Sequence, residues 1–184
     1  MRDLRWIAVT TVLFTVTLGF TGWSGFRNLA QQREWNTVLV DGVAGELEGV
    51  RVGVREARAS VIDSVPDRAL LFVRIDLLGA QASAQSWGDC RVSLHAPDGS
   101  TWMPIQSYSI RGAIRILAAD GKDYGNCNPT EVTENGPIAF DQIFRLPISA
   151  LDDLTLHVSG YGTRPAALAF PLRPEVRRFK VSSQ

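Results

Sequence analysis

Histidine, lysine and cysteine are scarce in this chain of 184 residues, with two residues of each type. Two histidines leave little material for a nucleophile–base pair, and the Gly-x-Ser-x-Gly elbow of α/β-hydrolases is missing. The P-loop and the dinucleotide-binding glycine pattern are also missing. The formal net charge is zero, so there is no basic footprint for nucleic acid. We therefore expect a protein that is not an enzyme, needs no cofactor and binds no nucleic acid.

Charged residues are also absent from residues 6–26, which begin at Trp6 and end at Phe26. At about 1.5 Å per residue, a helix of this length covers the ~30 Å hydrocarbon core of a bilayer. Two arginines within residues 1–5 favour a cytoplasmic N-terminus. The sequence therefore predicts a cytoplasmic head, a transmembrane signal anchor over residues 6–26, and a periplasmic or extracellular remainder. A cleaved secretory signal is the alternative, and it exports the same remainder.

The hydrophobic period changes to two after residues 27–48, which we expect to be a juxtamembrane linker. Val50, Val52 and Val54 alternate with polar residues or glycine, which is typical of a half-buried strand. Further strands are expected at residues 69–78, 90–96, 101–105, 142–146, 154–159, 167–172 and 176–181, and short helices at 114–119 and 148–151. Many short strands separated by turn residues predict one all-β, antiparallel sandwich over residues 49–184.

Several segments resemble membrane-anchored immunoglobulin-like domains of unknown function in bacterial envelopes. The resembling segments are VRVGVREAR at 50–58, ALLFVRIDLL at 69–78, DGSTW at 98–102, FRLP at 144–147 and LDDLTLHV at 151–158. The resemblance implies an immunoglobulin-like sandwich in an extracytoplasmic location. It brings no motif of catalytic residues.

The two cysteines, Cys90 and Cys127, both lie in the part that we expect to be exported, where an even pair is most simply a disulfide. Two unrelated thiols, one of them buried, are the alternative. A zinc site formed by both cysteines with His95 and His157 is disfavoured, because Cys90 and His95 would point to opposite faces of one strand. Each histidine also falls on the outward phase of its strand, so the two need not meet.

An irregular stretch, residues 119–137, contains a cluster of oxygen-bearing side chains. Calcium prefers six to eight such ligands, but the spacing is not that of an EF-hand, and Asp and Asn are common in turns. We therefore expect a plain loop, with calcium as the alternative. The candidate ligands are Asp120, Asp123, Asn126, Asn128 and Glu131.

These observations favour a non-catalytic binding or assembly domain, tethered to the membrane of a bacterial cell envelope, that recognises another protein. The loop Asp120–Pro137 is the expected contact region, because loops at the ends of a sandwich commonly carry binding. The aromatic candidates for partner contact are Trp87, Tyr108 and Tyr124, with ordinary packing as the alternative for each. The alternative function is a small-ligand or calcium-binding extracytoplasmic module.

Overall fold

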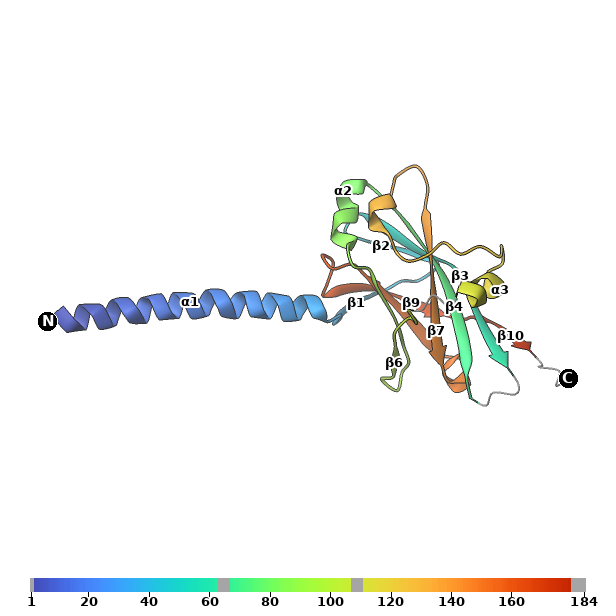
Figure 1. The fold of residues 1–184 in the computed structure, drawn as a ribbon, viewed down its shortest axis with the longest axis horizontal. Coiled ribbons are helices and arrows are strands. Elements are labelled where there is room, and N and C mark those ends of the chain that lie inside the picture. Colours follow the sequence, from blue (N-terminus) through green and yellow to red (C-terminus); the bar gives the residue numbers. More distant parts are fainter. Residues whose placement is uncertain (1, 63–66, 107–110, 180–184) are drawn as a thin grey trace.

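A long helix precedes a β domain in the computed structural model, which describes residues 2–62, 67–106 and 111–179 (Figure 1). The helix α1 spans Arg2–Gln32, and its segment Val9–Phe26 is long and apolar enough to cross a bilayer. None of that segment is buried, so α1 is not a core helix of the β domain. Threonine hydroxyls in α1 donate to carbonyls one turn back, as Thr10 does to Trp6 at 2.9 Å, which satisfies them without water.

Two sheets make up the β domain. In the first, sheet A, the strand order is β1 (Asn36–Leu39), β9 (Ala166–Leu172), β8 (Leu154–Ser159), β5 (Arg91–His95) and β6 (Thr101–Trp102). In the second, sheet B, the order is β10 (Glu175–Phe179), β3 (Val50–Ile62), β4 (Ala69–Gly79) and β7 (Ile138–Leu146), and β2 (Ala44–Leu47) also pairs with β3. The pairs β1–β9 and β10–β3 are parallel, so the sheets are mixed rather than purely antiparallel.

One hydrophobic core is shared by the two sheets. Alternate residues of β4, among them Leu71 and Ile75, are fully buried in it, as are Leu156 and Val158 of β8. Burying each such side chain contributes about 1.5–3 kcal/mol relative to leaving it in water. The period-two pattern of the sequence therefore marks the faces that meet between the sheets.

The outer face of sheet B is covered by a short helix, α3 (Arg111–Leu117). Ile114 and Leu117 of α3 form a second apolar cluster with Phe72 of β4 and Ile143 of β7. Because β4 is thus buried on both faces, its sequence is nearly continuously apolar. Arg74, which interrupts this apolar run, is itself buried.

Regular structure also occurs within the linker region 27–48 and in residues 80–88. Strands β1 and β2 fall within residues 27–48 and join the sheets, so the β domain begins close to the end of α1. Residues 80–88 form the short helix α2 (Gln81–Ala84) and the 3-10 turn η1 (Gln85–Trp87). Two more 3-10 turns are η3 (Pro129–Glu131) and η4 (Ile148–Ala150).

Trp87 was predicted as a partner contact, and this prediction is wrong. Its side chain is 0 % exposed, and its Nε1–H donates to the Leu47 carbonyl at 3.3 Å. Its backbone packs against Gly160, where a Cβ atom would overlap Trp87 itself. The turn η1 therefore folds the indole into the shared core, where it cannot touch a partner.

Candidate functional site

A row of charged residues crosses the outer face of sheet B beneath α3. Arg74 of β4 is in register with Glu56 of β3 on one side and with Asp141 of β7 on the other. Cross-strand neighbours of this kind lie about 5 Å apart, which places a cation between two anions. The arginine side chain is 2 % exposed and that of Asp141 is 0 % exposed.

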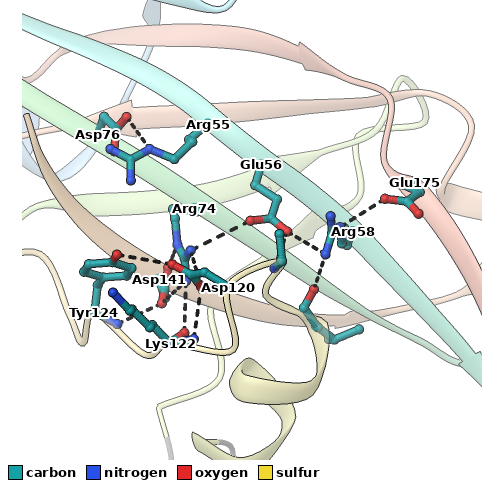
Figure 2. Close-up of polar contacts among 12 residues, drawn as sticks. Arg55, Glu56, Arg58, Arg74, Asp76, Asp120, Lys122, Tyr124, Asp141 and Glu175 are labelled. Carbon is teal, nitrogen blue, oxygen red and sulfur yellow. Dashed lines mark hydrogen bonds and ion pairs between the residues drawn. The ribbon is translucent and has the colours of Figure 1, made fainter.

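Arg74 uses its guanidinium to hold the chain segment that follows α3 (Figure 2). Its Nε and Nη2 donate to the two carboxylate oxygens of Asp141 at 2.7 and 3.1 Å. Its Nη1 donates to Asp120 Oδ1 at 2.9 Å, and its Nη2 also donates to the Lys122 carbonyl at 3.0 Å. Glu56 Oε2 lies 3.8 Å from Arg74 Nη1. A guanidinium that donates two hydrogen bonds to one carboxylate fixes the relative geometry of the two groups as well as pairing their charges.

The pKa values follow from these contacts. Burial disfavours the charged guanidinium, but its hydrogen bonds to Asp141 and Asp120 outweigh burial, so the pKa of Arg74 is raised. The same hydrogen bond from Arg74, with the Lys122 N–H, lowers the pKa of Asp120 to about 2. The Tyr124 ring stacks on the guanidinium, with its centroid 4.5 Å from the Arg74 Cζ. These contacts therefore favour the charged forms of Arg74 and Asp120.

The proposed calcium ligands use their oxygens for other contacts. Asp120 pairs with Arg74, and Asp123 accepts from the Gly125 N–H at 2.9 Å. Asn128 accepts from the Thr130 N–H at 3.3 Å and donates to Glu131 at 2.6 Å, which closes a local turn. Asn126 lies on the exposed surface. The structure does not bring these five side chains together around a common centre, and it places a guanidinium against the first.

A disulfide joins Cys90, just before β5, to Cys127 in the loop, with the two Cα atoms 6.1 Å apart. Both cysteines line a surface hollow, and a second hollow adjoins it. We call them together the disulfide groove; they share the lining residues Gln106, Asn126 and Gln142. Loop residues thus form one wall of the groove, and β7 forms another.

The remaining aromatic candidates have different outcomes. Tyr124 is 40 % exposed, and its hydroxyl donates to Asp120 Oδ2 at 3.2 Å, so one ring face is available at the surface while its position is fixed. Tyr108 lies outside the described residues. Of the three aromatic candidates, Tyr124 is therefore the described side chain that remains accessible to a partner.

A second, partly buried polar cluster lies on the outer face of sheet A. His95 ends β5, and His157 lies in the neighbouring strand β8, where it pairs in register with Ser93. This register makes the two histidines diagonal neighbours on one face. Their rings stack with centroids 3.9 Å apart. The strand pattern of the sequence did not predict this meeting, because it does not show which strands are neighbours.

Glu34 completes the second cluster, although it comes from the short segment between α1 and β1. Its Oε1 accepts a hydrogen bond from the Ser159 hydroxyl, and its Oε2 lies 3.9 Å from His157 Nδ1. The ligand atoms of Glu34, His95 and His157 all lie within 4.8 Å of one another. In the described part of the chain, this is the one group of three or more His, Cys, Asp or Glu side chains so arranged.

The pKa values of both imidazoles in the second cluster are lowered. Burial, and then the neighbouring His95, lower the pKa of His157 to about 4. Burial also lowers the pKa of His95, against an opposing effect of Glu34. Ser93 and Thr101 hydroxyls lie 2.9 and 3.4 Å from the two ring nitrogens of His95. His157 Nδ1, in contrast, is buried and has no hydrogen-bond partner.

The sequence contained a partial signal for each cluster. An arginine within the apolar run 69–78 indicates a charge that needs a covered partner. Two histidines on the outward phases of two strands could lie on one face of a sheet, although the sequence does not show that they meet. Nothing in the sequence pointed to Glu34, because a carboxylate in a juxtamembrane segment looks like ordinary surface charge. The zinc site that we considered with Cys90 and Cys127 is excluded, because their sulfurs form the disulfide.

Comparisons with known proteins give no family. No family model matches the chain, and no curated protein matches it. Among solved structures, it is similar to a "putative lipoprotein" from Staphylococcus aureus subsp. aureus NCTC 8325, with a TM-score of 0.48, 8% identity, and coverage of 76% of this chain and 96% of that one. It is also similar to a lipoprotein of the same description from Bacillus subtilis subsp. subtilis str. 168, with a TM-score of 0.43, 10% identity, and coverage of 72% and 39%. Likeness at this level does not bear on the function or on either cluster.

Proposed function

We propose that the protein is a non-catalytic binding or assembly domain, tethered to the membrane of a bacterial cell envelope, that recognises another protein. The tether is α1, whose apolar segment has the length of a bilayer crossing and lies outside the β domain. The disulfide supports an exported domain, because such bonds persist in oxidising compartments. A cytoplasmic N-terminus and an immunoglobulin-like sandwich belong to the same proposal, since sandwiches offer end loops and sheet edges for binding.

The observation that carries the proposal is the preorganised wall of the disulfide groove. One end of the loop is held by Arg74 through Asp120 and the Lys122 carbonyl, and its middle is held by the disulfide. Asp141 of β7 also fixes it, by accepting from the Tyr124 N–H at 2.9 Å. Because the loop is ordered before any partner arrives, binding would lose little further conformational entropy.

The shape and chemistry of the groove favour a macromolecule over a small ligand. Small-ligand pockets are enclosed and mostly apolar. The disulfide groove is open, and its two halves share three amide side chains, those of Gln106, Asn126 and Gln142. Met103, which is well exposed, adds an adaptable apolar contact at its rim. Methionine is among the residue types that are enriched at protein–protein interfaces, so this rim favours a protein partner.

The alternative, a calcium- or small-ligand-binding module, has weaker support. Asp120 is already neutralised by Arg74, and a calcium ion there would have to compete with a buried guanidinium. A thermal shift in millimolar calcium would favour this alternative. We expect none.

Crosslinking in the native membrane tests the proposal. The tagged full-length protein would be crosslinked and its partners quantified against α1 fused to an unrelated domain. Asn126→Arg introduces a bulky charge at an exposed position of the groove, and Gln81→Arg makes a similar change on α2, outside the groove lining. A partner that is enriched with the wild type and Gln81→Arg but lost with Asn126→Arg supports the proposal. No partner above the α1 control, or one that Asn126→Arg retains, contradicts it.

A further inference from the structure

We propose that Glu34, His95 and His157 bind a divalent transition-metal ion of the Zn²⁺ class. The site lies on the outer face of sheet A and uses none of the residues of the disulfide groove. This inference is therefore independent of the proposed protein-binding function. Two imidazoles and one carboxylate are a ligand set that zinc and its neighbours in the first transition row use in proteins. Calcium and magnesium are disfavoured here, because they prefer a full set of oxygen ligands.

The distances fit such an ion with little movement. Ligand atoms about 2.1 Å from a tetrahedral centre lie about 3.4 Å from one another. Glu34 Oε2 and His157 Nδ1 are 3.9 Å apart, and all three ligand atoms lie within 4.8 Å. A closing movement on the order of 1 Å would complete the coordination, which is within the reach of side-chain torsions.

An ion between these residues would also satisfy two groups that the protein leaves incomplete. His157 Nδ1 is buried without a hydrogen-bond partner, and a lone pair on that atom is a metal ligand. The Glu34 side chain is 6 % exposed, and its Oε2 lies 3.9 Å from His157 Nδ1, which is too far for a hydrogen bond. Burying a carboxylate without a balancing positive charge is costly, and a divalent cation supplies that charge.

The surroundings hold the ligands in a binding-competent state. The hydroxyls of Ser159 and Thr101 lie against Glu34 and His95 and orient them. Such supporting hydrogen bonds are a regular part of protein metal sites.

The position of Glu34 gives the ion a structural consequence. Glu34 lies just after the last residue of α1, Gln32, whereas both histidines belong to sheet A. A bound ion would therefore fasten the exit of the membrane helix to the β domain and fix the angle between them. Three protein ligands leave a fourth position for water or for a side chain from another molecule.

Zinc titration of the full-length protein in detergent tests this inference. The protein would carry an affinity tag without histidine, would be stripped with a chelator, and would then compete for Zn²⁺ with a chromogenic chelator. We expect one Zn²⁺ per chain. Glu34→Gln and His157→Gln should weaken zinc binding by at least about 100-fold, because even the loss of a supporting partner costs 10–100-fold. Glu46→Gln, an exposed carboxylate on β2, is the matched control and should bind like the wild type.

Folding is checked separately in each variant. Glu34→Gln keeps the shape of the side chain and an oxygen for the Ser159 hydroxyl, so its circular dichroism should match that of the wild type. Substituting Co²⁺ should give the intense visible bands of a four-coordinate ion in the wild type and not in Glu34→Gln. Binding of less than one Zn²⁺ per folded wild-type chain overturns the inference, as does unchanged zinc affinity in the folded Glu34→Gln variant.

Discussion

The outer faces of the two sheets each carry a buried polar cluster, and the two clusters differ in how completely they are satisfied. Around Arg74, each guanidinium nitrogen donates to an oxygen, and carboxylates of opposite charge surround the cation. Around Glu34, one imidazole nitrogen has no partner and the carboxylate faces a neutral ring. Complete clusters are explained by architecture, whereas an incomplete one calls for a further explanation such as a ligand.

The clusters also differ in what they connect. The Arg74 cluster joins β3, β4 and β7 to the segment after α3, all within the β domain. The Glu34 cluster joins sheet A to the chain that leaves the membrane helix. In our proposals, the first cluster holds the wall of the binding groove, and the second fixes the β domain relative to α1.

Removing the guanidinium should have the largest effect. Arg74→Met leaves Asp141 buried without its cation, so we expect the free energy of unfolding to fall by about 3–5 kcal/mol. Urea unfolding of the full-length protein in detergent, followed by the fluorescence of buried Trp87 together with the other tryptophans, measures it.

A second substitution tests the reason for that loss. Adding Asp141→Leu to Arg74→Met removes the uncompensated charge and should recover part of the stability, as a non-additive double-mutant cycle. If Arg74→Met costs less than about 1 kcal/mol, the value typical of an exposed pair, the Arg74 cluster is not the buried ion pair described here.

Breaking the disulfide should have the next largest effect. In the chain-entropy model, a bridge across a separation of 37 residues stabilises the folded state by about 4 kcal/mol. We expect the double variant Cys90→Ser/Cys127→Ser to lose an amount near this value, which a melting curve in detergent measures. Loop protection from proteolysis should fall as well, whereas the Glu34 cluster should keep its zinc affinity.

Acidification should destabilise the folded protein through His157 of the Glu34 cluster. The unfolded chain protonates His157 near pH 6.5 and the folded chain only near pH 4, so the unfolded state binds more protons between these values. With metal removed, we expect the free energy of unfolding to fall by about 3 kcal/mol from pH 7 to pH 4. Because Glu34 and His95 face this ring, the comparison is made against His157→Gln, which should lose less over the same range. An equal loss of unfolding free energy in the wild type and in His157→Gln would refute the assignment of this pH dependence to His157.

Neutralising Glu34 should have the smallest effect. In metal-free protein, Glu34→Gln removes a buried charge that lacks a balancing cation and keeps the acceptor for Ser159. We expect a change below about 1 kcal/mol, in contrast to Arg74→Met. A loss as large as that of Arg74→Met would mean that the Glu34 cluster is already complete without an ion.

The regular strands could be predicted from the sequence because burial on one face imposes a period of two. The expected strands at 69–78 and 154–159 coincide closely with β4 and β8. The short strands β1 and β2 could not be predicted, since four residues with little alternation carry no clear period. Their place in the sheets comes from pairing with β9 and β3, which is tertiary information.

The site residues were harder to predict, because they depend on which strands are neighbours. His95 and His157 meet through the β5–β8 pairing, across 62 positions of sequence. Asp120 was a candidate calcium ligand because the sequence does not show that an arginine from a distant strand pairs with it. We predicted a partner contact for Trp87 because small, polar residues surround it, which is typical of a loop. In the structure, α2 and η1 turn the indole inward.

The free energy of unfolding with and without zinc tests the contrast between the clusters most directly. At free zinc 100-fold above its Kd, the wild-type protein should gain about 2.7 kcal/mol over the chelator-treated protein, and Glu34→Gln should gain almost nothing. A gain of the same size in both proteins, or none in the wild type, would contradict the assignment of Glu34, His95 and His157 as a metal site.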